Sequence, residues 1–437
     1  MLALASPTEP HNEGNSGKRS ASGVVPTTSD VDRSVSRRLP RRPAPNDVTP
    51  TVYSHLPIGV VENRKIPALL PTTSKGLCAL CVGVRVKKNR KPMQAYGNIQ
   101  SHLPPGGGVG MVDLIRAELD ALSNDLSGLT VVTGAGSGFE GTAATMAAMA
   151  GARRVFALTR QSGLYPSAAE AARATLEPAR RAGVAGRIEV CGSIAGRDWG
   201  EVDILLNCRA IRPISRATIG LLPRRAVIGL MAASWELRPD VVDLQGSAAA
   251  GIKVVELDLD HPRIRLLAEF GRLCALLASE TGLDLRGAPT ALICDTPCRA
   301  FIERELAMRG AVVSSFAHPG LVTGEDWRLL VLAMRPSSAT TMDVANLGRI
   351  GKSAPGAHIV QFSGTLDRSA AKYFGLTVWP ARNPGRDQPG LPLEALGVEL
   401  VLRKLAGGLK AAELGYHNLA GGHDSLARLV NTENEKR

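Results

Sequence analysis

A glycine-rich turn between an apolar segment and a run of small residues constrains the fold of this 437-residue chain more than any other feature. The turn contains Gly136-x-Gly138-x-x-Gly141, follows the predicted strand at 129–133 and opens a predicted helix over 142–150. Glycine permits a tight turn and a close approach of the main chain, and the free amides at a helix start favour an anion. Strand, turn and helix in this order predict a site for the pyrophosphate of a dinucleotide, with a plain glycine turn as the alternative. The residues predicted to contact the dinucleotide here are Gly134, Gly136, Ser137, Gly138, Phe139 and Gly141.

The end of the second predicted strand, 154–158, indicates which dinucleotide the turn would hold. An acidic residue at this place would bind the ribose hydroxyls of NAD, but the sequence has Thr159 and Arg160. Arginine suits the 2′-phosphate of NADP, so we predict NADP(H) as the preferred cofactor and NAD as the less favoured one. Thr159 would add a hydroxyl donor. The alternative role of Arg160 is a solvated charge at a strand end.

Two polar residues lie at the end of the fourth predicted strand, 203–207, and in the turn after it. Ligands of doubly wound sheets bind beyond the carboxyl ends of the strands. Asn207 and Arg212 are therefore predicted at the rim of the nicotinamide side, with an ordinary polar loop as the alternative for each.

Short apolar segments alternate with helical ones from residue 129 onward, which predicts parallel strands joined by right-handed crossovers. The first series predicts strands at 129–133, 154–158, 188–190, 203–207, 226–230 and 253–257. The second series predicts strands at 290–294, 311–315, 327–333, 358–362 and 376–379. The expected fold class is α/β, with a doubly wound Rossmann domain over 128–283 and a second α/β domain, which would bind substrate, over 284–416.

The remaining segments are less regular. Residues 1–50 lack apolar periodicity and predict a disordered tail. Residues 51–127 form an N-terminal segment of uncertain fold that ends in an amphipathic helix over 111–122. A closing helix pair is predicted at 392–413 and a frayed C-terminus at 417–437. The Ser- and Arg-rich start allows a transit peptide as an alternative, but it carries acidic residues, which such segments lack.

Charge and cysteine content exclude several classes of protein. The net charge is +12, but the basic runs at 33–42 and 85–91 lack interleaved aromatic residues, so solvated surface is favoured over a nucleic-acid partner. Seven scattered cysteines do not suit a disulfide framework and predict a reducing, cytoplasmic location. No apolar run reaches about eighteen residues, so no membrane span is predicted. Cys78-x-x-Cys81 lacks a second ligand pair at zinc spacing, so no metal site is predicted.

The residues that follow the fifth and sixth predicted strands are candidates for chemistry. Hydride transfer at a carbon bearing a hydroxyl or an amine needs a base near neutral pH and, for an acid substrate, a cation. Arg238 can bind a carboxylate through two parallel hydrogen bonds, and Glu236 and His261 are the candidate bases. A lone histidine is more often structural. Cys294 and Cys298 would be reactive if the helix start lowered a thiol pKa.

The motif Thr133-Gly-Ala-Gly-Ser-Gly138 resembles the opening of short-chain dehydrogenases, which need a Tyr-x-x-x-Lys pair. None of the five tyrosines has a lysine four residues later, so that mechanism is not expected. The order of segments instead resembles two-domain NAD(P)-dependent dehydrogenases, which include the 2-hydroxyacid and alanine dehydrogenases.

Segment 222–243 is similar to the hydroxyacid enzymes, in which an arginine after the fifth strand binds the substrate carboxylate, and Arg238 falls at that place. His318 in 317–320 is similar to their histidine loop. The pairing of 136–160 with 207–214 also resembles NADP-dependent methylene-tetrahydropterin dehydrogenases. These resemblances imply an NADP(H)-dependent oxidoreductase for a small hydroxy, oxo or amino acid-like substrate, and by family habit a homodimer. The rival from another class is a regulatory or scaffolding protein that binds NADP(H) without turnover.

Overall fold

The computed structural model describes residues 110–136, 138–159, 167–237, 240–337, 339–384, 388–422 and 424–430. The predictions for the tail, for 51–109 and for Ser137, Arg160 and Arg238 lie outside these residues. For Phe139 only the main chain is described.

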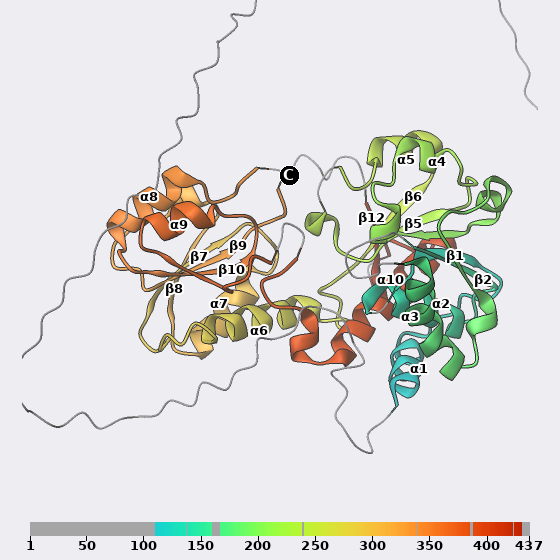
Figure 1. Ribbon diagram of the computed structural model, residues 1–437, viewed down its shortest axis with the longest axis horizontal. Helices are drawn as coiled ribbons and strands as arrows, with labels where there is room; N and C mark the ends of the chain where they lie inside the picture. The colour runs from blue at the N-terminus through green and yellow to red at the C-terminus, as the bar shows by residue number, and fades with distance from the viewer. Residues whose placement is uncertain are drawn as a thin grey trace, which may run out of the picture. The chain divides into compact units, whose positions relative to one another are not determined.

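The glycine-rich turn belongs to a seven-stranded sheet of the described residues (Figure 1). Its strands are β1 (Thr130–Gly134), β2 (Arg154–Leu158), β3 (Ile188–Cys191), β4 (Ile204–Leu206), β5 (Val227–Leu230), β6 (Lys253–Leu257) and β12 (Ala427–Leu429). The spatial order is β12-β6-β5-β4-β1-β2-β3; β12 is antiparallel to β6 and all other pairs are parallel. The order 3-2-1-4-5-6 is that of a doubly wound dinucleotide-binding sheet, and it reverses between β1 and β4. The prediction of a doubly wound Rossmann domain is confirmed.

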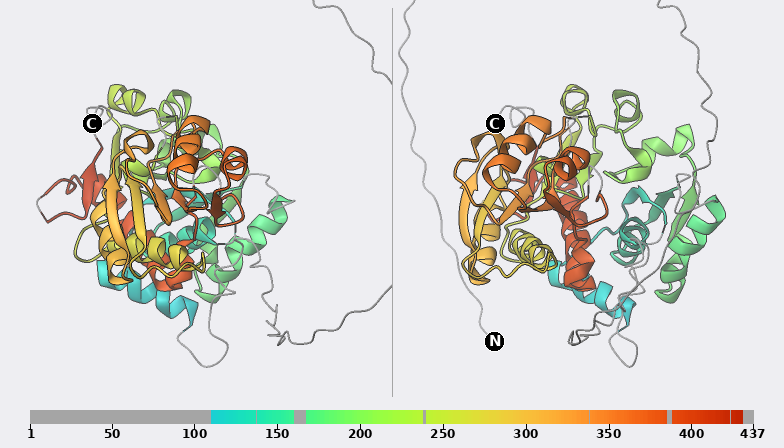
Figure 2. Two further views of the ribbon diagram at one scale, coloured as in Figure 1. Left: turned by 90° about the vertical axis from the view of Figure 1, so that its left-hand side faces the viewer. Right: turned by 60° about the vertical axis from the view of Figure 1, so that its left-hand side comes forward.

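Helices cover both faces of this first sheet. On one face α2 (Phe139–Met149) packs against β1 and β2, and α10 (Val398–Tyr416) packs against β5 and β6. α1 (Met111–Leu122) lies against α10, the long red helix of Figure 2, and α3 (Ala168–Arg181) lies against α2. On the other face α5 (Leu244–Ala250) packs against β6 and against α4 (Arg216–Ile219).

The strands are buried on both sides because successive side chains enter different cores. Val131 packs in the core under α2 and α10, whereas the next residue, Val132, packs with Phe156 and Leu205 in the core on the other face. Continuous apolar strands of this kind are typical of parallel sheets.

A second sheet has five strands in the described residues: β7 (Pro289–Cys294), β8 (Val312–Phe316), β9 (Leu329–Ala333), β10 (His358–Ser363) and β11 (Thr377–Trp379). All pairs are parallel and the order is β11-β10-β9-β7-β8. Counted within this sheet the order is 2-1-3-4-5, the other common doubly wound arrangement, and it reverses between β7 and β9. The predicted second α/β region is therefore also doubly wound.

Helices lie on both faces of the second sheet (Figures 1 and 2). α6 (Leu266–Ser279) and α7 (Arg299–Met308) share one core with Leu292 and Val331, and α8 (Val344–Ser353) and α9 (Arg368–Tyr373) share the opposite core with Ile293 and Leu330.

The C-terminal part differs from the prediction. Instead of a helix pair, the 3-10 turn η7 (Leu393–Leu396) precedes the single helix α10, which packs on the first sheet although its residues were assigned to the second domain. Glycines explain this docking, because a Cβ on Gly415 would lie 2.7 Å from a methyl of Val255. The segment predicted as frayed contains β12, paired with β6. Among the described residues no helix is both long and apolar enough to cross a bilayer.

Candidate functional site

The turn after β1 has a main chain that requires glycine. Gly136 and Gly138 have φ angles of 138° and 74°. A Cβ on Gly141 would lie 1.7 Å from the carbonyl oxygen of Gly136, so the first turn of α2 rests directly on the loop. Gly134 is the last residue of β1 and pairs with Leu158 in β2. The structure thus brings the predicted glycines together in one tight strand–turn–helix unit.

A residue of α3 fixes the position of this turn. The amide of Gly136 donates to Oγ1 of Thr175 at 2.7 Å, and the Thr175 hydroxyl donates to the carbonyl oxygen of Ala171 at 2.8 Å. Thr175 is fully buried. The sequence prediction missed this residue, and its only signal was a threonine within an alanine-rich helix.

Among the residues that the structure describes, no side chain caps the start of α2. Gly138 is the residue before the helix and provides no side chain to bind the first amides. The first main-chain bond of the helix runs from Thr142 N to Gly138 O at 3.0 Å, so the earlier amides of the first turn point out of the helix end. Ala143, Ala144 and Ala147 are buried and let α2 lie close to the sheet. An open helix start beside a glycine loop can hold a phosphate group.

Asn207 lies just beyond the carboxyl end of β4, the neighbour of β1, and only 1% of its surface is exposed. The Arg212 guanidinium donates from Nε to Oδ1 of Asn207 at 2.7 Å and from Nη2 to the Asn207 carbonyl oxygen at 3.0 Å. These contacts fix the orientation of the amide. Its Nδ2 atom has no hydrogen-bond partner among the described residues. A buried donor without a partner is costly and points to a ligand at this edge.

Thr159 follows β2 and is held by the neighbouring strand. Its amide donates to the carbonyl oxygen of Cys191 at 2.8 Å, and its hydroxyl donates to the same oxygen at 3.4 Å. This anchors the point from which the chain continues to Arg160.

Glu236 is tied to the long C-terminal helix. Its Oε1 accepts the amide of Ala233 at 3.2 Å, and its Oε2 accepts a hydrogen bond from Nζ of Lys404 at 3.2 Å. The side chain of Lys404 is 12% exposed, and its ammonium lies 5.4 Å from the ring centre of Phe270. The carboxylate predicted as a base therefore joins the loop after β5 to α10.

Both predicted histidines contact their own loops. Nδ1 of His261 accepts the amide of Arg263 at 3.2 Å, and Nε2 lies 3.3 Å from the carbonyl oxygen of Asp424. His318 is exposed after β8, where its Nδ1 accepts the amide of Gly320 at 3.0 Å. No described contact joins either histidine to the glycine turn.

A carboxyl group that the sequence prediction missed lies at the carboxyl end of β6. Glu256 pairs with Leu230 of β5, and its Oε2 accepts a short hydrogen bond from the amide of Ser234. Burial raises the pKa of the Glu256 carboxyl, although that bond and the charge of Arg428 oppose the rise. A glutamate on a strand with buried neighbours was the only signal in the sequence.

The suggestion of a reactive thiol after β7 is wrong. Cys298 is 2% exposed, and burial raises its thiol pKa to about 12. Burial likewise raises the pKa of Cys294. Both thiols stay protonated at neutral pH, so desolvation outweighs any effect of the helix start.

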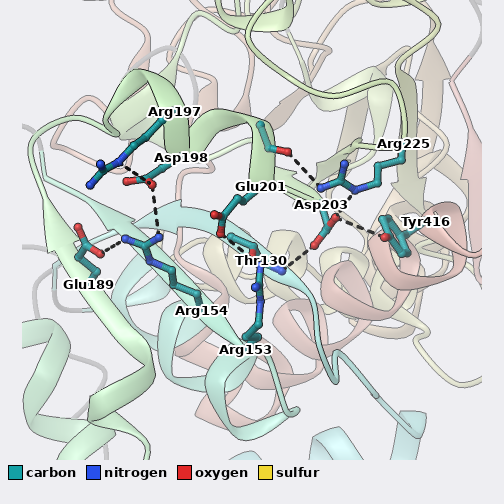
Figure 3. Close-up of polar contacts among 11 residues, drawn as sticks. Thr130, Arg153, Arg154, Glu189, Arg197, Asp198, Glu201, Asp203, Arg225 and Tyr416 are labelled. Carbon is teal, nitrogen blue, oxygen red and sulfur yellow. Dashed lines mark hydrogen bonds and ion pairs between the residues drawn. The ribbon is translucent and has the colours of Figure 1, made fainter.

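The opposite, amino edge of the first sheet carries the charged network of Figure 3. Asp203 lies just before β4; its Oδ2 accepts the amide of Thr130 at 2.9 Å, and its Oδ1 accepts Nε of Arg225 at 2.8 Å and the hydroxyl of Tyr416 at 3.3 Å. Arg154, at the start of β2, pairs with two further acids. Polar groups at this edge have partners within the fold, which gives them a structural role.

No family model matches the sequence, and no curated protein matches it. Among solved structures the chain is similar to NAD-dependent formate dehydrogenase from Staphylococcus aureus in complex with NAD, at 12% identity over 69% of this chain and 99% of that chain, with a TM-score of 0.41. It is also similar to a dipicolinate synthase from Bacillus halodurans, at 12% identity over 67% of this chain and 99% of that chain, with a TM-score of 0.40. The chain is also similar to methylenetetrahydrofolate dehydrogenase/cyclohydrolase from Campylobacter jejuni, at 12% identity over 69% of this chain and 94% of that chain, with a TM-score of 0.25. Because the similarity is low, we assign the fold from the strand order of this chain and infer its function from this chain's own residues.

Proposed function

We propose that the first sheet binds a nicotinamide dinucleotide, NADP(H) in preference to NAD(H), and that the protein is an oxidoreductase. The observation that carries the proposal is the contact of Gly141 with the Gly136 carbonyl, at the strand reversal of a 3-2-1-4-5-6 sheet. Pyrophosphates bind at this place in such sheets, where the open helix start offers amides and the positive end of the helix dipole.

The buried amide of Asn207 supports a ligand that extends across the sheet. An unsatisfied buried donor costs about 1–3 kcal/mol, which a bound acceptor would recover. Because Arg212 holds Oδ1, only Nδ2 is directed to the ligand. Asn207 would thus orient the nicotinamide half, and Gly136 and Gly141 would hold the pyrophosphate.

The substrate would be a small hydroxy, oxo or amino acid. The bound nicotinamide supplies the site that gives or accepts hydride. Arg238, from its place in the sequence after β5, would bind the substrate carboxylate. Among the carboxyl groups near this edge, Glu256 has the environment best suited to move a proton, because its raised pKa lies nearer to neutral pH.

A dinucleotide-binding protein without turnover is the second candidate. The contacts that favour it are those of Glu236 with Lys404 and of His261 with Arg263 and Asp424, since they occupy two of the predicted bases. In this case the glycine turn and Asn207 would bind NADP(H), and the protein would have a regulatory or scaffolding role.

Calorimetric titration of the full chain with NADPH and with NADH tests cofactor binding. We expect NADPH to bind more tightly, and Arg160→Gln to weaken NADPH by about tenfold or more while leaving NADH unchanged, since only NADPH carries the 2′-phosphate. An equal loss for both nucleotides would assign Arg160 no role in discrimination.

Turnover is then followed by the near-ultraviolet absorbance of the reduced nicotinamide with pooled hydroxy, oxo and amino acids. Consumption or formation of NADPH with one pool supports the oxidoreductase. Tight NADPH binding without turnover on any pool supports the second candidate, and absence of binding by both nucleotides rejects the two together.

A further inference from the structure

Two arginines beyond the carboxyl ends of β7 and β9 have no acidic partner among the described residues. Arg299, the first residue of α7, donates from Nε and Nη2 to the carbonyl oxygen of Cys294 at 3.1 and 2.7 Å. Arg335, two residues past β9, donates from Nε to the carbonyl oxygen of Asp295 at 3.2 Å. Neither guanidinium forms an ion pair with any residue that the structure describes.

The two arginines lie at the strand reversal of the second sheet. β7 and β9 are neighbours there, and Cys294 is paired with Ala333, so the segments that follow the two strands start side by side. The carbonyl oxygens that hold the two guanidinium groups belong to consecutive residues. Ligands of doubly wound sheets bind at this point.

The charges at this point are unbalanced. Asp295 is the nearby acid, and its Oδ1 accepts the amide of Arg335 at 2.8 Å, a contact that shapes the loop. By contrast Arg286, just before β7, has an acidic partner, since it donates from Nη2 to Asp284 at 2.9 Å. Arg335 is exposed and Arg299 is half-buried, so both guanidinium groups can reach an anion that binds at this edge.

The carboxyl edge of the second sheet carries further cationic and donor groups, which lie after β10 and at the end of β11. Arg368 donates from Nε and Nη2 to Oε1 of Gln361 at 3.1 and 2.7 Å and from Nη1 to the carbonyl oxygen of Ala381 at 3.0 Å. All these acceptors are neutral, and burial lowers the pKa of Arg368. Trp379, at the end of β11, has a buried Nε1 donor without a hydrogen-bond partner in the described residues. Cationic and donor groups thus continue along the edge from β7 to β11.

We propose that Arg299 and Arg335 form a binding site for the carboxylate or phosphate group of a small organic anion. Each side chain keeps N–H donors that no described residue uses, and a guanidinium can bind either group through two parallel bonds. The site does not depend on dinucleotide binding by the first sheet.

Calorimetry on the full chain at low ionic strength tests this site, with citrate and inorganic pyrophosphate as the probes. We expect at least one probe to bind, and the double variant Arg299→Gln/Arg335→Gln to bind it at least about tenfold more weakly. The matched control is Arg286→Gln, which removes a paired, exposed arginine of the same sheet and leaves binding unchanged. Preference for citrate identifies a carboxylate site, and preference for pyrophosphate identifies a phosphate site.

The glycine turn could also hold pyrophosphate, so the titration is repeated on wild type saturated with NADPH and on Gly141→Val. Probe binding that persists in NADPH-saturated wild type and in Gly141→Val supports the arginine site. Probe binding that is lost in these two samples but kept in the double arginine variant overturns the arginine site. Failure of both probes to bind wild type also overturns it. If the double variant melts early by circular dichroism, Arg299→Lys/Arg335→Lys keeps the charges, and intermediate affinity is expected. Normal NADPH binding by the arginine variants separates this test from that of the proposed function.

Discussion

The two sheets place different chemistry at the point where their strand order reverses. In the first sheet β1 leads into a turn that contains three glycines of the fingerprint and no arginine, and Gly141 rests on the Gly136 carbonyl. In the second sheet β7 leads into Asp295-Thr-Pro-Cys298, which has no glycine. Arg299 and Arg335 lie there, and neither has an acidic partner in the part of the chain that the structure describes. Main-chain amides reach a pyrophosphate only where side chains are absent, whereas guanidinium groups reach an anion from a distance. One architecture therefore supports two kinds of anion site, and the residues of a single turn decide which.

The helix starts agree with this comparison. α5, α8 and α9 begin at Asp243, Asp343 and Asp367, whose carboxylates accept amides of their own first turns. α2 and α7, which follow the first strand of each sheet, have no such side-chain cap. At α7 the amide of Arg299 donates to the carbonyl oxygen of Thr296 at 3.3 Å, whereas at α2 the first main-chain bond comes from Thr142, so we expect the start of α2 to offer amides to an external acceptor.

The largest expected effect comes from Gly141→Val. The new Cβ would overlap the Gly136 carbonyl oxygen, so the turn must open and the pyrophosphate site is lost. We expect NADPH affinity to fall by about a hundredfold or more, measured by calorimetry, and thermal stability to fall with it. Anion binding by the second sheet should persist.

Gly186→Ala is the control, because Gly186 has an ordinary φ and no atom within 4 Å of the added Cβ. It should leave both sites and the melting temperature unchanged. Tight NADPH binding by Gly141→Val would show that the glycine turn of the first sheet does not hold the pyrophosphate. The proposed difference between the anion sites of the two sheets would then be wrong.

Asp203→Ala tests whether the amino edge is structural while the carboxyl edge binds ligands. The side chain of Asp203 is 8% exposed, and its loss leaves the buried amide of Thr130 without its acceptor. We expect the free energy of unfolding to fall by about 2–3 kcal/mol in urea titrations, with little change in NADPH affinity. A large loss of affinity at unchanged stability would contradict the separation of the two edges. Arg153→Gln, which removes an exposed ion pair with Glu201, should cost less than about 1 kcal/mol.

The sequence predicted the strands well because each is a short apolar run ended by polar or glycine residues. β2 and β6 have the predicted bounds, and α1 matches residue for residue. Strand order could not be predicted in the second sheet, because periodicity says nothing about neighbours. β12 and the docking of α10 were missed because both depend on contacts with strands far away in the sequence, as between Gly415 and Val255.

The candidate site divides in the same way. The glycines were found because they satisfy a local backbone requirement, and Asn207 was found because it follows a strand. Thr175 and Glu256 were missed because their importance comes from a packed partner and from burial. The role of His261 as a loop contact also depends on Asp424, far along the chain.

Asn207→Asp tests the neutral amide donor that we expect to orient the nicotinamide half of the cofactor at the first sheet. Aspartate keeps the acceptor for Arg212 and replaces only the free Nδ2 donor. We expect NADPH affinity to fall by about tenfold with stability nearly unchanged, measured by calorimetry and by thermal melting. Unchanged affinity would mean that Nδ2 faces no ligand atom.

Glu256→Gln gives the smallest effect on stability. It tests the sign of the charge at the two carboxyl edges, since a buried acid lies near the first, and arginines without a described acidic partner lie near the second. Burial raises the pKa of Glu256, so its carboxyl binds a proton more tightly in the folded than in the unfolded chain. Its contribution to stability is fully present below the ordinary value of 4.5 and is lost as pH rises through the raised value of the folded state. Glutamine cannot ionise and its carbonyl oxygen can still accept the Ser234 amide, so the unfolding free energy of the variant should gain on wild type across that window. The measurement is urea unfolding as a function of pH. The control is Glu280→Gln, at an exposed glutamate, which should show no such gain. If Glu256→Gln instead loses stability relative to wild type as pH rises, the folded chain stabilises the ionised carboxylate.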